Sequence, residues 1–382
     1  MKILFYLRIE IMGGAERYLL QLLPELKKRK IDVGFFCTQQ KTNQAMIDYF
    51  TSHFKPYDIP VYVCNSSYPY SLKAAHQLAV IIRKERYDIL SAHLMHAEII
   101  SGLSKMLFKT SCKLVTTKHG YLQKFMDQHG LDYTKINRLS LSYQVEKWVQ
   151  RFVAGNFAVS KGLADFYIHS GICKASKMSV IYHGLEAGNQ HQQAAPVRYS
   201  NNQLLVIARL RKFKGHLFLI DAVQLLCREI PDLKLVILGA GEEMEHLVNR
   251  VNELNLNQWV AFAGYSNHVY HYIYGSDIIV APSIAEPFGL IVLEAYSCSK
   301  PVIAFNVTAF NETIIDNETG YLVGPYNTEA LAEKIKYLLQ NKSIAQKLGE
   351  NGLELLRNKF SLRTSVEQTI QFFTAIQSSQ VS

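Results

Sequence analysis

This chain of 382 residues lacks the patterns that mark several common protein classes. Its six cysteines are scattered without any C-x-x-C spacing, which favours a reducing compartment over a secreted disulfide scaffold. No run of 18 apolar residues occurs, and the apolar opening Lys2–Leu7 stops at Arg8, so the sequence predicts neither a membrane span nor a secretory signal. Together these absences predict a cytoplasmic protein.

Basic residues are concentrated in the first half of the chain. Residues 1–185 carry 25 basic and 13 acidic side chains, a net charge of +12, whereas residues 186–382 carry 16 and 19, a net charge of −3. No helix-turn-helix, zinc finger or aromatic RNA-binding signature accompanies this charge, so no nucleic-acid partner is predicted. Contact with an anionic membrane surface or a phosphate-bearing acceptor suits the pattern better, although plain solvation of surface helices would also explain it. The basic residues that favour such contact are Lys27, Lys28, Arg29, Lys105, Lys109 and Lys124.

Short apolar runs alternate with longer helical patterns in both halves, which predicts an α/β fold with parallel sheets built from βαβ units. The predicted strands are 2–7, 32–38, 61–65, 88–93, 113–117, 152–160, 179–182, 203–208, 233–238, 259–263, 277–281, 301–305 and 321–323. The predicted helices are 15–29, 72–86, 96–106, 136–150, 217–229, 242–252, 288–297, 329–339 and 344–356.

The length and the 48% hydrophobic content allow two domains, each with its own core. We expect two Rossmann-like, doubly wound domains at residues 1–185 and 201–360, joined by a polar, glutamine-rich linker at 186–200. The amphipathic end of the chain, residues 361–382, is expected to form a helix that packs back on the first domain. Doubly wound sheets bind ligands at the carboxyl ends of their strands, so the predicted active site is a cleft between the two domains.

The most informative motif contains two glutamates eight positions apart, Glu286 and Glu294. A strand, a turn and a helix beginning near Phe288 would place Glu286 on a loop and Glu294 in the second turn of the helix. The unpaired donors of such a helix start, suited to anionic oxygens, would be the amides of Phe288, Gly289 and Leu290. The carboxylates can bind sugar hydroxyls, and the amides beside them can bind phosphate. This combination indicates an enzyme that handles a nucleotide-sugar.

Two cations, Arg209 and Lys214, follow the first strand of the second half. A nucleoside diphosphate becomes more negative as the sugar departs, and two fixed cations can stabilise that charge without a metal. No D-x-D pair occurs in the chain, so the usual means of holding a divalent ion on a nucleotide-sugar is missing, and neither a metal nor another cofactor is predicted. Without the glutamates downstream, the same basic loop would be interpreted as ordinary solvated surface.

Glycines mark two further turns. Gly13 and Gly14 follow the first strand and open the first helix, where the backbone can approach a phosphate, although a tight turn would need the same residues. Gly239 ends a strand of the second half and is predicted to shape the cleft near the nucleotide, although a plain strand-to-helix turn explains it equally well.

Three histidines stand at predicted strand ends: His93, His119 and His183. Histidine suits proton handling or a hydrogen bond to a sugar or phosphate oxygen. His119 is the preferred candidate, whereas for His93 a satisfied core position is an equal alternative. A zinc site would have no cysteine ligands and is disfavoured.

Several motifs, in order along residues 1–360, resemble glycosyltransferase family 4, whose members have the GT-B fold. The motifs that carry this resemblance are Gly13-Gly14-Ala-Glu-Arg17, Lys118-His-Gly120, Phe157-Ala-Val-Ser160, Val180-Ile-Tyr-His-Gly184, Arg209…Lys214-Gly215, Gly239-Ala-Gly241 and Glu286-Pro-Phe-Gly…Glu294. The resemblance implies a retaining, metal-independent transfer of a sugar from a nucleoside-diphosphate donor to a glycan or lipid-linked acceptor of a cell-surface polysaccharide such as lipopolysaccharide. It also implies action in the cytoplasm or at the cytoplasmic face of the membrane.

The resemblance also implies roles for single residues. Arg209 and Lys214 would contact the diphosphate, Glu294 the ribose, and Glu286 the sugar. The Gly13-Gly14 loop would close over the phosphates, and His119 would lie near the transferred sugar. The leaving phosphate would help to deprotonate the acceptor on the same face of the sugar.

The chain departs from the family pattern in two places. The segment Asn306–Glu312 replaces a Gly-Gly-x-Pro-Glu motif, which leaves the identity of the sugar open, and His183 replaces an asparagine that is common before the interdomain glycine. One alternative is a nucleotide-sugar epimerase or hydrolase on the same fold, which would consume the donor without an acceptor. Another is a non-catalytic nucleotide-sugar-binding protein, which the intact set of glutamates and cations disfavours.

Overall fold

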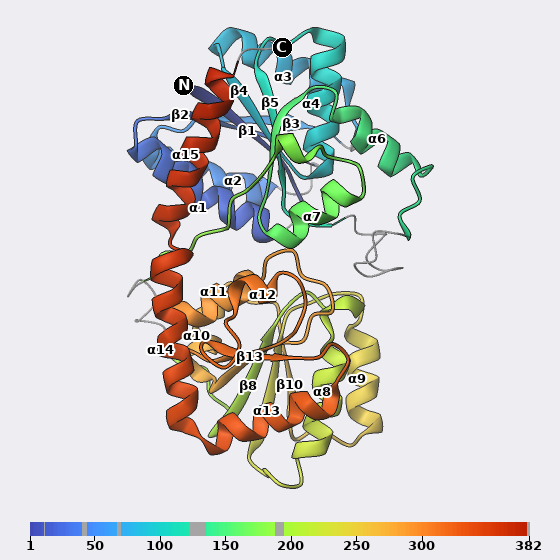
Figure 1. Cartoon of the computed structure of the whole chain (residues 1–382), viewed down its shortest axis with the longest axis vertical. Helices are drawn as coiled ribbons and strands as arrows, with labels where there is room; N and C mark the ends of the chain where they lie inside the picture. The colour runs from blue at the N-terminus through green and yellow to red at the C-terminus, as the bar shows by residue number, and fades with distance from the viewer. Residues whose placement is uncertain (11, 40–43, 67–69, 122–134, 188–194, 380–382) are drawn as a thin grey trace. The chain divides into compact units, whose positions relative to one another are not determined.

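The computed structural model describes residues 1–10, 12–39, 44–66, 70–121, 135–187 and 195–379. These residues form two compact units (Figure 1). The first, here the N-terminal domain, contains the described residues of Met1–Tyr121, Asp132–His183 and Leu362–Ser382. The second, here the C-terminal domain, contains those of Gly184–Ser361. Each domain is built on one parallel sheet, which confirms the α/β class predicted from the sequence.

The N-terminal sheet has the order β3-β2-β1-β4-β5-β6-β7, with all neighbouring strands parallel. Its strands are β1 (Lys2–Ile9), β2 (Asp32–Gln39), β3 (Val61–Asn65), β4 (Ile89–His93), β5 (Lys113–Lys118), β6 (Val153–Ala158) and β7 (Met178–Val180). The strand order reverses between β1 and β4, as in a doubly wound fold. Ligands bind such sheets at the carboxyl ends of the strands that flank the reversal.

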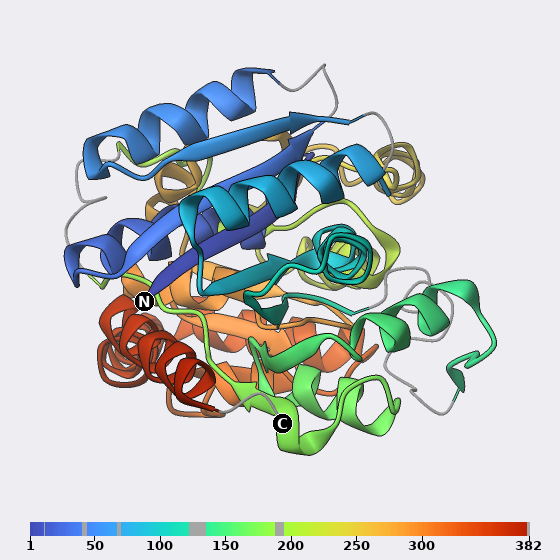
Figure 2. The same cartoon turned by 90° about the horizontal axis from the view of Figure 1, so that it is seen from above.

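Helices cover both faces of this sheet (Figure 2). They are α1 (Gly14–Lys28), α2 (Gln44–Phe54), α3 (Leu72–Glu85), α4 (Leu94–Phe108), α6 (Leu141–Val149), α7 (Lys161–His169) and α15 (Leu362–Ser378). Because strand side chains alternate between faces, Phe5 packs in one core with residues of α1, α2 and α15, whereas Tyr6 packs in a second core with residues of α3 and α4. Burial on both faces explains why these strands appear in the sequence as continuous apolar runs.

The last helix, α15, belongs to the N-terminal domain and lies beside α1 (Figure 1). The ring of Phe373 meets that of Phe5 edge-on at a centroid distance of 5.8 Å. The hydroxyl of Ser365 donates to the carbonyl oxygen of Tyr182 at 2.7 Å, and Lys113 Nζ donates to the carbonyl oxygen of Ile376 at 2.8 Å. The end of the chain therefore completes the core that its first strand begins.

The C-terminal sheet has the order β10-β9-β8-β11-β12-β13 and is also parallel and doubly wound. Its strands are β8 (Asn202–Ile207), β9 (Leu233–Leu238), β10 (Val260–Gly264), β11 (Ile278–Ala281), β12 (Val302–Phe305) and β13 (Gly320–Val323). Here the order reverses between β8 and β11, so the loops that follow these two strands flank the expected ligand position.

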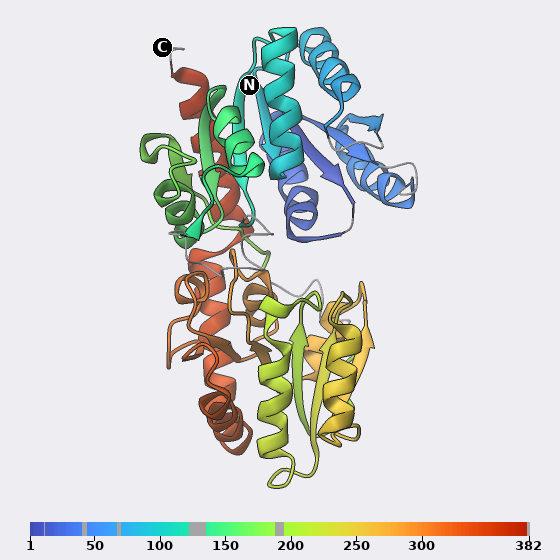
Figure 3. The same ribbon diagram turned by 90° about the vertical axis from the view of Figure 1, so that its right-hand side faces the viewer.

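Most helices of the C-terminal domain are joined in one series of contacts. The helices of this domain are α8 (His216–Leu226), α9 (Met244–Glu253), α10 (Val269–Gly275), α11 (Leu290–Ser297), α12 (Phe310–Thr313), α13 (Thr328–Gln340) and α14 (Lys342–Lys359). Contacts join α9 to α8, α8 to α13, α13 to α14, α14 to α11 and α11 to α10. Figure 3 shows α8, coloured yellow-green, and α9, coloured yellow, alongside the strands of this sheet.

Some sequence predictions of element bounds were wrong. The helix predicted at 136–150 begins at Leu141, because the hydroxyl of Ser140 caps it by accepting from the Tyr143 amide at 3.4 Å. The strand predicted to reach Ser160 ends at Ala158, and Ser160 instead caps α7. The sequence analysis did not predict the helices α2, α7, α10 and α12, which have at most 11 residues.

Candidate active site

Three loops at the carboxyl ends of β8, β9 and β11 are held together in the C-terminal domain. We call them the β8 loop (208–215), the β9 loop (239–243) and the β11 loop (282–289). The Leu210 amide donates to the Ala240 carbonyl oxygen at 3.0 Å, which joins the first two loops. The Ile284 amide donates to the Phe213 carbonyl oxygen at 2.9 Å, which joins the first and third. Residues distant in the sequence are thereby placed in one site.

Lys214 and Glu286 meet across two of these loops. Lys214 Nζ lies 2.6 Å from Glu286 Oε2, and the two side chains are only 17% and 12% exposed. Glu286 lies on the β11 loop, as predicted, but the sequence did not predict that it would bind the lysine directly. The pair leaves the site without net charge from these two groups. An approaching phosphate oxygen would compete with Glu286 for the ammonium and release the carboxylate toward the rest of the ligand.

Gly215 allows this approach of the β8 and β11 loops. Its φ of +72° is in the left-handed region, and a Cβ atom there would overlap the carbonyl oxygen of Pro282. Next to it, His216 is buried at the start of α8, and burial together with nearby Lys214 lowers its pKa to about 4.

Arg209, at the other end of the β8 loop, is exposed. Gly239 uses its amide to bind the Gly264 carbonyl oxygen at 2.8 Å, so it joins β9 to β10.

Helix α11 begins later than predicted. Its first residue is Leu290, capped by Gly289 at a φ of +88°, where a Cβ atom would meet the ring of Phe310 at 2.6 Å. Phe288 precedes the helix, with its side chain buried near the ring of Phe360. The first turn therefore presents the amides of Leu290 and the following residue, and the prediction that the helix begins near Phe288 is corrected by two residues.

Glu294 lies in the second turn of α11, as predicted, and is 8% exposed. A helix N-terminus carries partial positive charge, which favours anionic oxygens near Leu290. The C-terminal domain thus combines a cation, two carboxylates and helix-start amides around one group of loops.

The glycines at the start of α1 are arranged differently from the prediction. Gly13 is the cap residue, and its amide donates to Glu16 Oε2 at 3.0 Å, a capping box made by the glutamate three residues on. Gly14 is exposed and is the first helical residue. The Gly13 amide is therefore already bound within the helix start, and a phosphate would have to displace the Glu16 carboxylate to reach it.

Three histidines and a tyrosine gather at the carboxyl end of the N-terminal sheet. His93 Nδ1 lies 2.7 Å from His119 Nε2, and His93 Nε2 lies 3.1 Å from the hydroxyl of Ser91. The rings of His119 and His183 are stacked, with centroids 5.4 Å apart. Tyr18 from α1 meets His183 edge-on at a centroid distance of 4.5 Å. The three histidines predicted at strand ends are thus in one cluster.

This cluster is electrically neutral at physiological pH. Burial lowers the pKa of His183 to about 3, and burial with nearby His183 lowers that of His93 to about 3. Burial, then His93 and His183, lower the pKa of His119 well below its ordinary value. His119 can therefore donate or accept a hydrogen bond, but it does not carry a positive charge at pH 7.

Next to His119 lies a buried ion cluster that the sequence analysis missed. Lys118 Nζ lies 2.6 Å from Glu98 Oε2, both side chains are 2% exposed, and Nζ also lies 4.7 Å from the centroid of the Tyr167 ring. The Tyr167 hydroxyl donates to the Gly120 carbonyl oxygen at 2.9 Å. A third acid, Glu146 of α6, is buried nearby, and its pKa is raised to about 7 by burial and by the Glu98 charge, against the effect of Lys118. Contacts of this cluster thus hold Lys118 and Gly120, the residues before and after His119 in the sequence.

A signal for this cluster is present in the sequence. Glu98 interrupts an otherwise apolar helix pattern, and Glu146 shares a helix face with Tyr143 and Val149, which are buried. An acid at a core position of a helix requires a partner, since buried carboxylates are paired or protonated.

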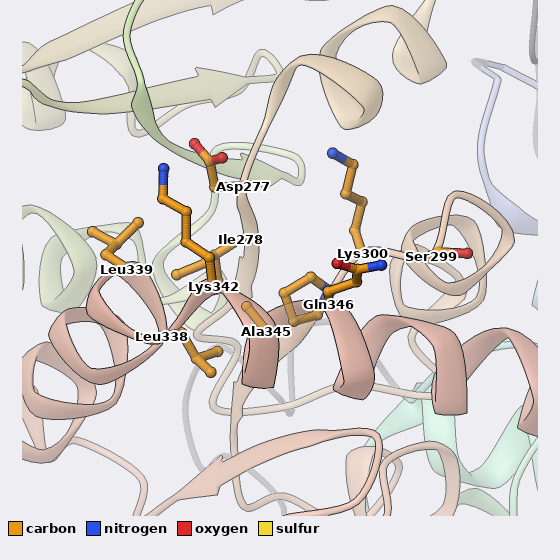
Figure 4. Close-up of a pocket in the computed structure, with 10 residues that line it drawn as sticks. Asp277, Ile278, Ser299, Lys300, Leu338, Leu339, Lys342, Ala345 and Gln346 are labelled. Carbon is orange, nitrogen blue, oxygen red and sulfur yellow. The ribbon is translucent and has the colours of Figure 1, made fainter.

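A pocket of about 200 Å³ lies at the opposite, amino end of the C-terminal strands (Figure 4). Two of its charged groups are already bound: Lys300 Nζ donates to the carbonyl oxygens of Tyr274 and Ser276, and Asp277 pairs with Arg198 at 2.9 Å; Lys342 also lines the pocket. We therefore assign it no part in the chemistry. Within the described residues, no three histidine, cysteine, aspartate or glutamate side chains are arranged to hold a metal ion.

Comparison with known proteins gives a consistent result. A family model described as Glycosyltransferase Family 4 matches residues 12–188, and one described as Glycosyl transferases group 1 matches residues 189–355. An Escherichia coli UDP-Gal:alpha-D-GlcNAc-diphosphoundecaprenol alpha-1,3-galactosyltransferase is 25% identical over 82% of this chain and 81% of its own length. The Staphylococcus aureus capsular polysaccharide biosynthesis glycosyltransferase CapM is 24% identical over 76% of this chain and 77% of its own.

Solved structures show the same fold. Anabaena HepE, crystallised in complex with UDP-glucose, superposes with a TM-score of 0.80 at 21% identity, covering 98% of this chain and all of that one. Sucrose-phosphate synthase from Thermosynechococcus elongatus superposes with a TM-score of 0.77 at 20% identity over the full length of both chains.

Proposed function

Since this chain belongs to glycosyltransferase family 4 and has the GT-B fold, we propose that it is a retaining, metal-independent enzyme that moves a sugar from a nucleoside-diphosphate donor to a glycan or lipid-linked acceptor. Its place is in the synthesis of a polysaccharide or other glycan. The observation that carries the proposal is the Lys214–Glu286 pair beside the start of α11.

The donor would bind the three C-terminal loops. Lys214 and the exposed Arg209 would hold the diphosphate, and the amides at the start of α11 would bind phosphate oxygens. Glu294, in the second turn, would accept hydrogen bonds from the ribose. Once Lys214 turns to the phosphate, Glu286 is released to accept hydrogen bonds from the sugar.

The reaction would then break the bond between the anomeric carbon and the phosphate oxygen, and form a bond to the acceptor oxygen on the same face. The acceptor proton would pass to the leaving phosphate. Charge on that phosphate would be stabilised by the positive charges of Lys214 and Arg209. A neutral His119 would contribute a hydrogen bond and not a proton.

A lipid-linked acceptor would bring the enzyme to the cytoplasmic face of a membrane, where the basic N-terminal domain would meet anionic lipid. No helix among the described residues is long and apolar enough to cross a bilayer. Of the six basic residues singled out above, Lys124 lies outside the described residues. Lys27, Lys28 and Arg29 pair with acids, and Lys105 Nζ donates to the carbonyl oxygen of Thr110, beyond the end of α4. Membrane contact would therefore depend on other basic residues of this domain, together with the exposed Lys109. Failure of anionic vesicles to retain the protein at low salt would exclude it.

The test is release of nucleoside diphosphate from UDP-, GDP- and ADP-sugars, with chelator present and with candidate acceptors. Lys214→Met and Glu286→Gln are expected to lose at least about a hundredfold in kcat/KM, the usual loss when a charge-stabilising group is removed. Lys336→Met is the matched control, because Lys336 forms an ion pair with Glu229 at a separate place in the same domain. Consumption of the donor to the same extent without any acceptor would support a hydrolase or epimerase. Binding without turnover under all conditions would support a non-catalytic protein.

A further inference from the structure

The hydrogen-bonded chain Ser91–His93–His119 constrains the protons of both imidazoles. A neutral imidazole has one N–H donor and one acceptor nitrogen, and burial keeps both rings neutral. In the 2.7 Å contact, either His93 Nδ1 donates to His119 Nε2 or the reverse. If His93 donates, the proton of each ring is on Nδ1; if it accepts, the proton of each ring is on Nε2. The two histidines must therefore have the same tautomer.

Ser91 decides between the two tautomers. It is fully buried on β4, and its contact with His93 Nε2 is the one hydrogen bond that its hydroxyl makes to the described residues. If His93 donated from Nε2, the hydroxyl proton of Ser91 would have no acceptor in the core, which is unfavourable. If Ser91 donates to His93 Nε2, then His93 Nδ1–H donates to His119 Nε2, and both protons have acceptors. The remaining donor is Nδ1–H of His119.

This remaining donor lies at the end of the sheet where ligands bind. His119 is half-buried, yet its Nδ1 atom is buried and has no hydrogen-bond partner among the described residues. A buried polar atom without a partner in the protein is the arrangement expected where a substrate supplies one.

We propose that Ser91 and His93 are positioning residues that hold His119 in the Nδ1–H tautomer, so that His119 donates a hydrogen bond to an oxygen atom of the nucleotide-sugar. That oxygen belongs either to the sugar or to the diphosphate, and both accept a neutral N–H. The inference rests on the proposed function for the identity of the ligand, but the tautomer is a property of the protein alone.

The first test therefore needs no activity. In the ¹⁵N-labelled protein at pH 7.5, long-range ¹H–¹⁵N spectra distinguish protonated from unprotonated ring nitrogens. We expect protonated Nδ1 and unprotonated Nε2 in both His93 and His119, each signal identified by its loss in His93→Asn or His119→Asn. Protonated Nε2 in either ring would overturn the proposal.

The second test uses Ser91→Ala, with Ser101→Ala as control. Ser101 is an equally buried serine, and its hydroxyl donates to the Ala97 carbonyl oxygen on α4, apart from the histidines. Without the Ser91 hydroxyl, the hydrogen bond between His93 and His119 can reverse its direction in Ser91→Ala. We therefore expect signals of the Nε2–H tautomer and about threefold to tenfold weaker binding of UDP-glucose, the effect of one neutral hydrogen bond. Ser91→Thr restores the hydroxyl and should restore both.

The ligand oxygen follows from a comparison of UDP with UDP-glucose. Weaker binding of both ligands to Ser91→Ala would assign the oxygen to the diphosphate, and weaker binding of UDP-glucose alone would assign it to the sugar. Wild-type tautomers and wild-type affinity in Ser91→Ala would overturn the positioning role. If no nucleotide-sugar binds the wild type, the proposed function fails, whereas the spectra still test the tautomer.

Discussion

Replacing Glu98 and Glu146, singly and together, should show that Glu146 can take the place of Glu98 as the ion-pair partner of the buried Lys118. Lys118 is 2% exposed, and although burial lowers its pKa, the acids around it, chiefly Glu98, hold the pKa above the ordinary value. Leaving such a buried charge without a partner costs about 3–5 kcal/mol. The double variant Glu98→Gln/Glu146→Gln should lose about that much stability in the N-terminal domain.

Each single variant should lose much less than half of that stability. Glu98→Gln removes the charge that helps to hold the Glu146 pKa near 7, so Glu146 can ionise and replace Glu98 beside Lys118. Glu146→Gln replaces a protonated acid by an amide of the same shape and should cost under about 1 kcal/mol below pH 7. The stability lost in the double variant should therefore exceed the sum of the two single losses by about 2 kcal/mol.

The assay is urea unfolding of the N-terminal domain. The chain has two tryptophans, Trp148 on α6 and Trp259 in the C-terminal domain, so Trp148 fluorescence reports on the N-terminal domain in a Trp259→Phe background. The raised pKa of Glu146 gives a pH signature as well. Its contribution to stability is present below about pH 4.5 and is lost as pH rises through about 7, a loss that Glu146→Gln should abolish. Additive costs in the double variant would refute the replacement of Glu98 by Glu146 as the partner of Lys118.

Three further outcomes follow from the same structure. The lowered pKa of His93 and His183 gives stability that is complete above about pH 6.5 and is lost as pH falls toward 3; at pH 5 each should cost the N-terminal domain about 2 kcal/mol, and equal unfolding midpoints at pH 5 and 7.5 in the Glu146→Gln variant, which removes the opposing effect of Glu146, would contradict this. Gly215→Ala should displace the β8 loop from Pro282, destabilise the C-terminal domain by more than about 1 kcal/mol and weaken donor binding, while Trp148 unfolding stays unchanged. Ending the chain after Ser361 removes α15, whose Val366 and Phe373 are fully buried, so amide exchange should become fast throughout the N-terminal sheet but stay slow in the C-terminal sheet.

The sequence was sufficient for the parallel sheets and for the gathering of the histidines. Strands buried on both faces are continuous apolar runs, and the carboxyl ends of parallel strands lie at one edge, so residues at the ends of β4, β5 and β7 lie at the same edge of the sheet. The stacking of His183 on His119 is a further step, because β6 separates their strands in the sheet. Side-chain reach across that strand is not visible in the spacing of residues.

Element ends and charge partners were less predictable. Ser140 and Ser160 decide where α6 and α7 begin through single hydrogen bonds that compete with the apolar pattern around them. Glu16 binds the Gly13 amide that the glycine pattern alone would leave for a phosphate.

By itself, the sequence determined the α/β class, the strand ends that carry the candidate residues, and the family, because apolar periodicity and ordered motifs are local properties of the chain. Only the tertiary structure decided which charges meet. Lys214 is 72 residues from Glu286, and Lys118 is 20 residues from Glu98. Whether such groups pair depends on which loops and helices pack together, and burial then sets their protonation.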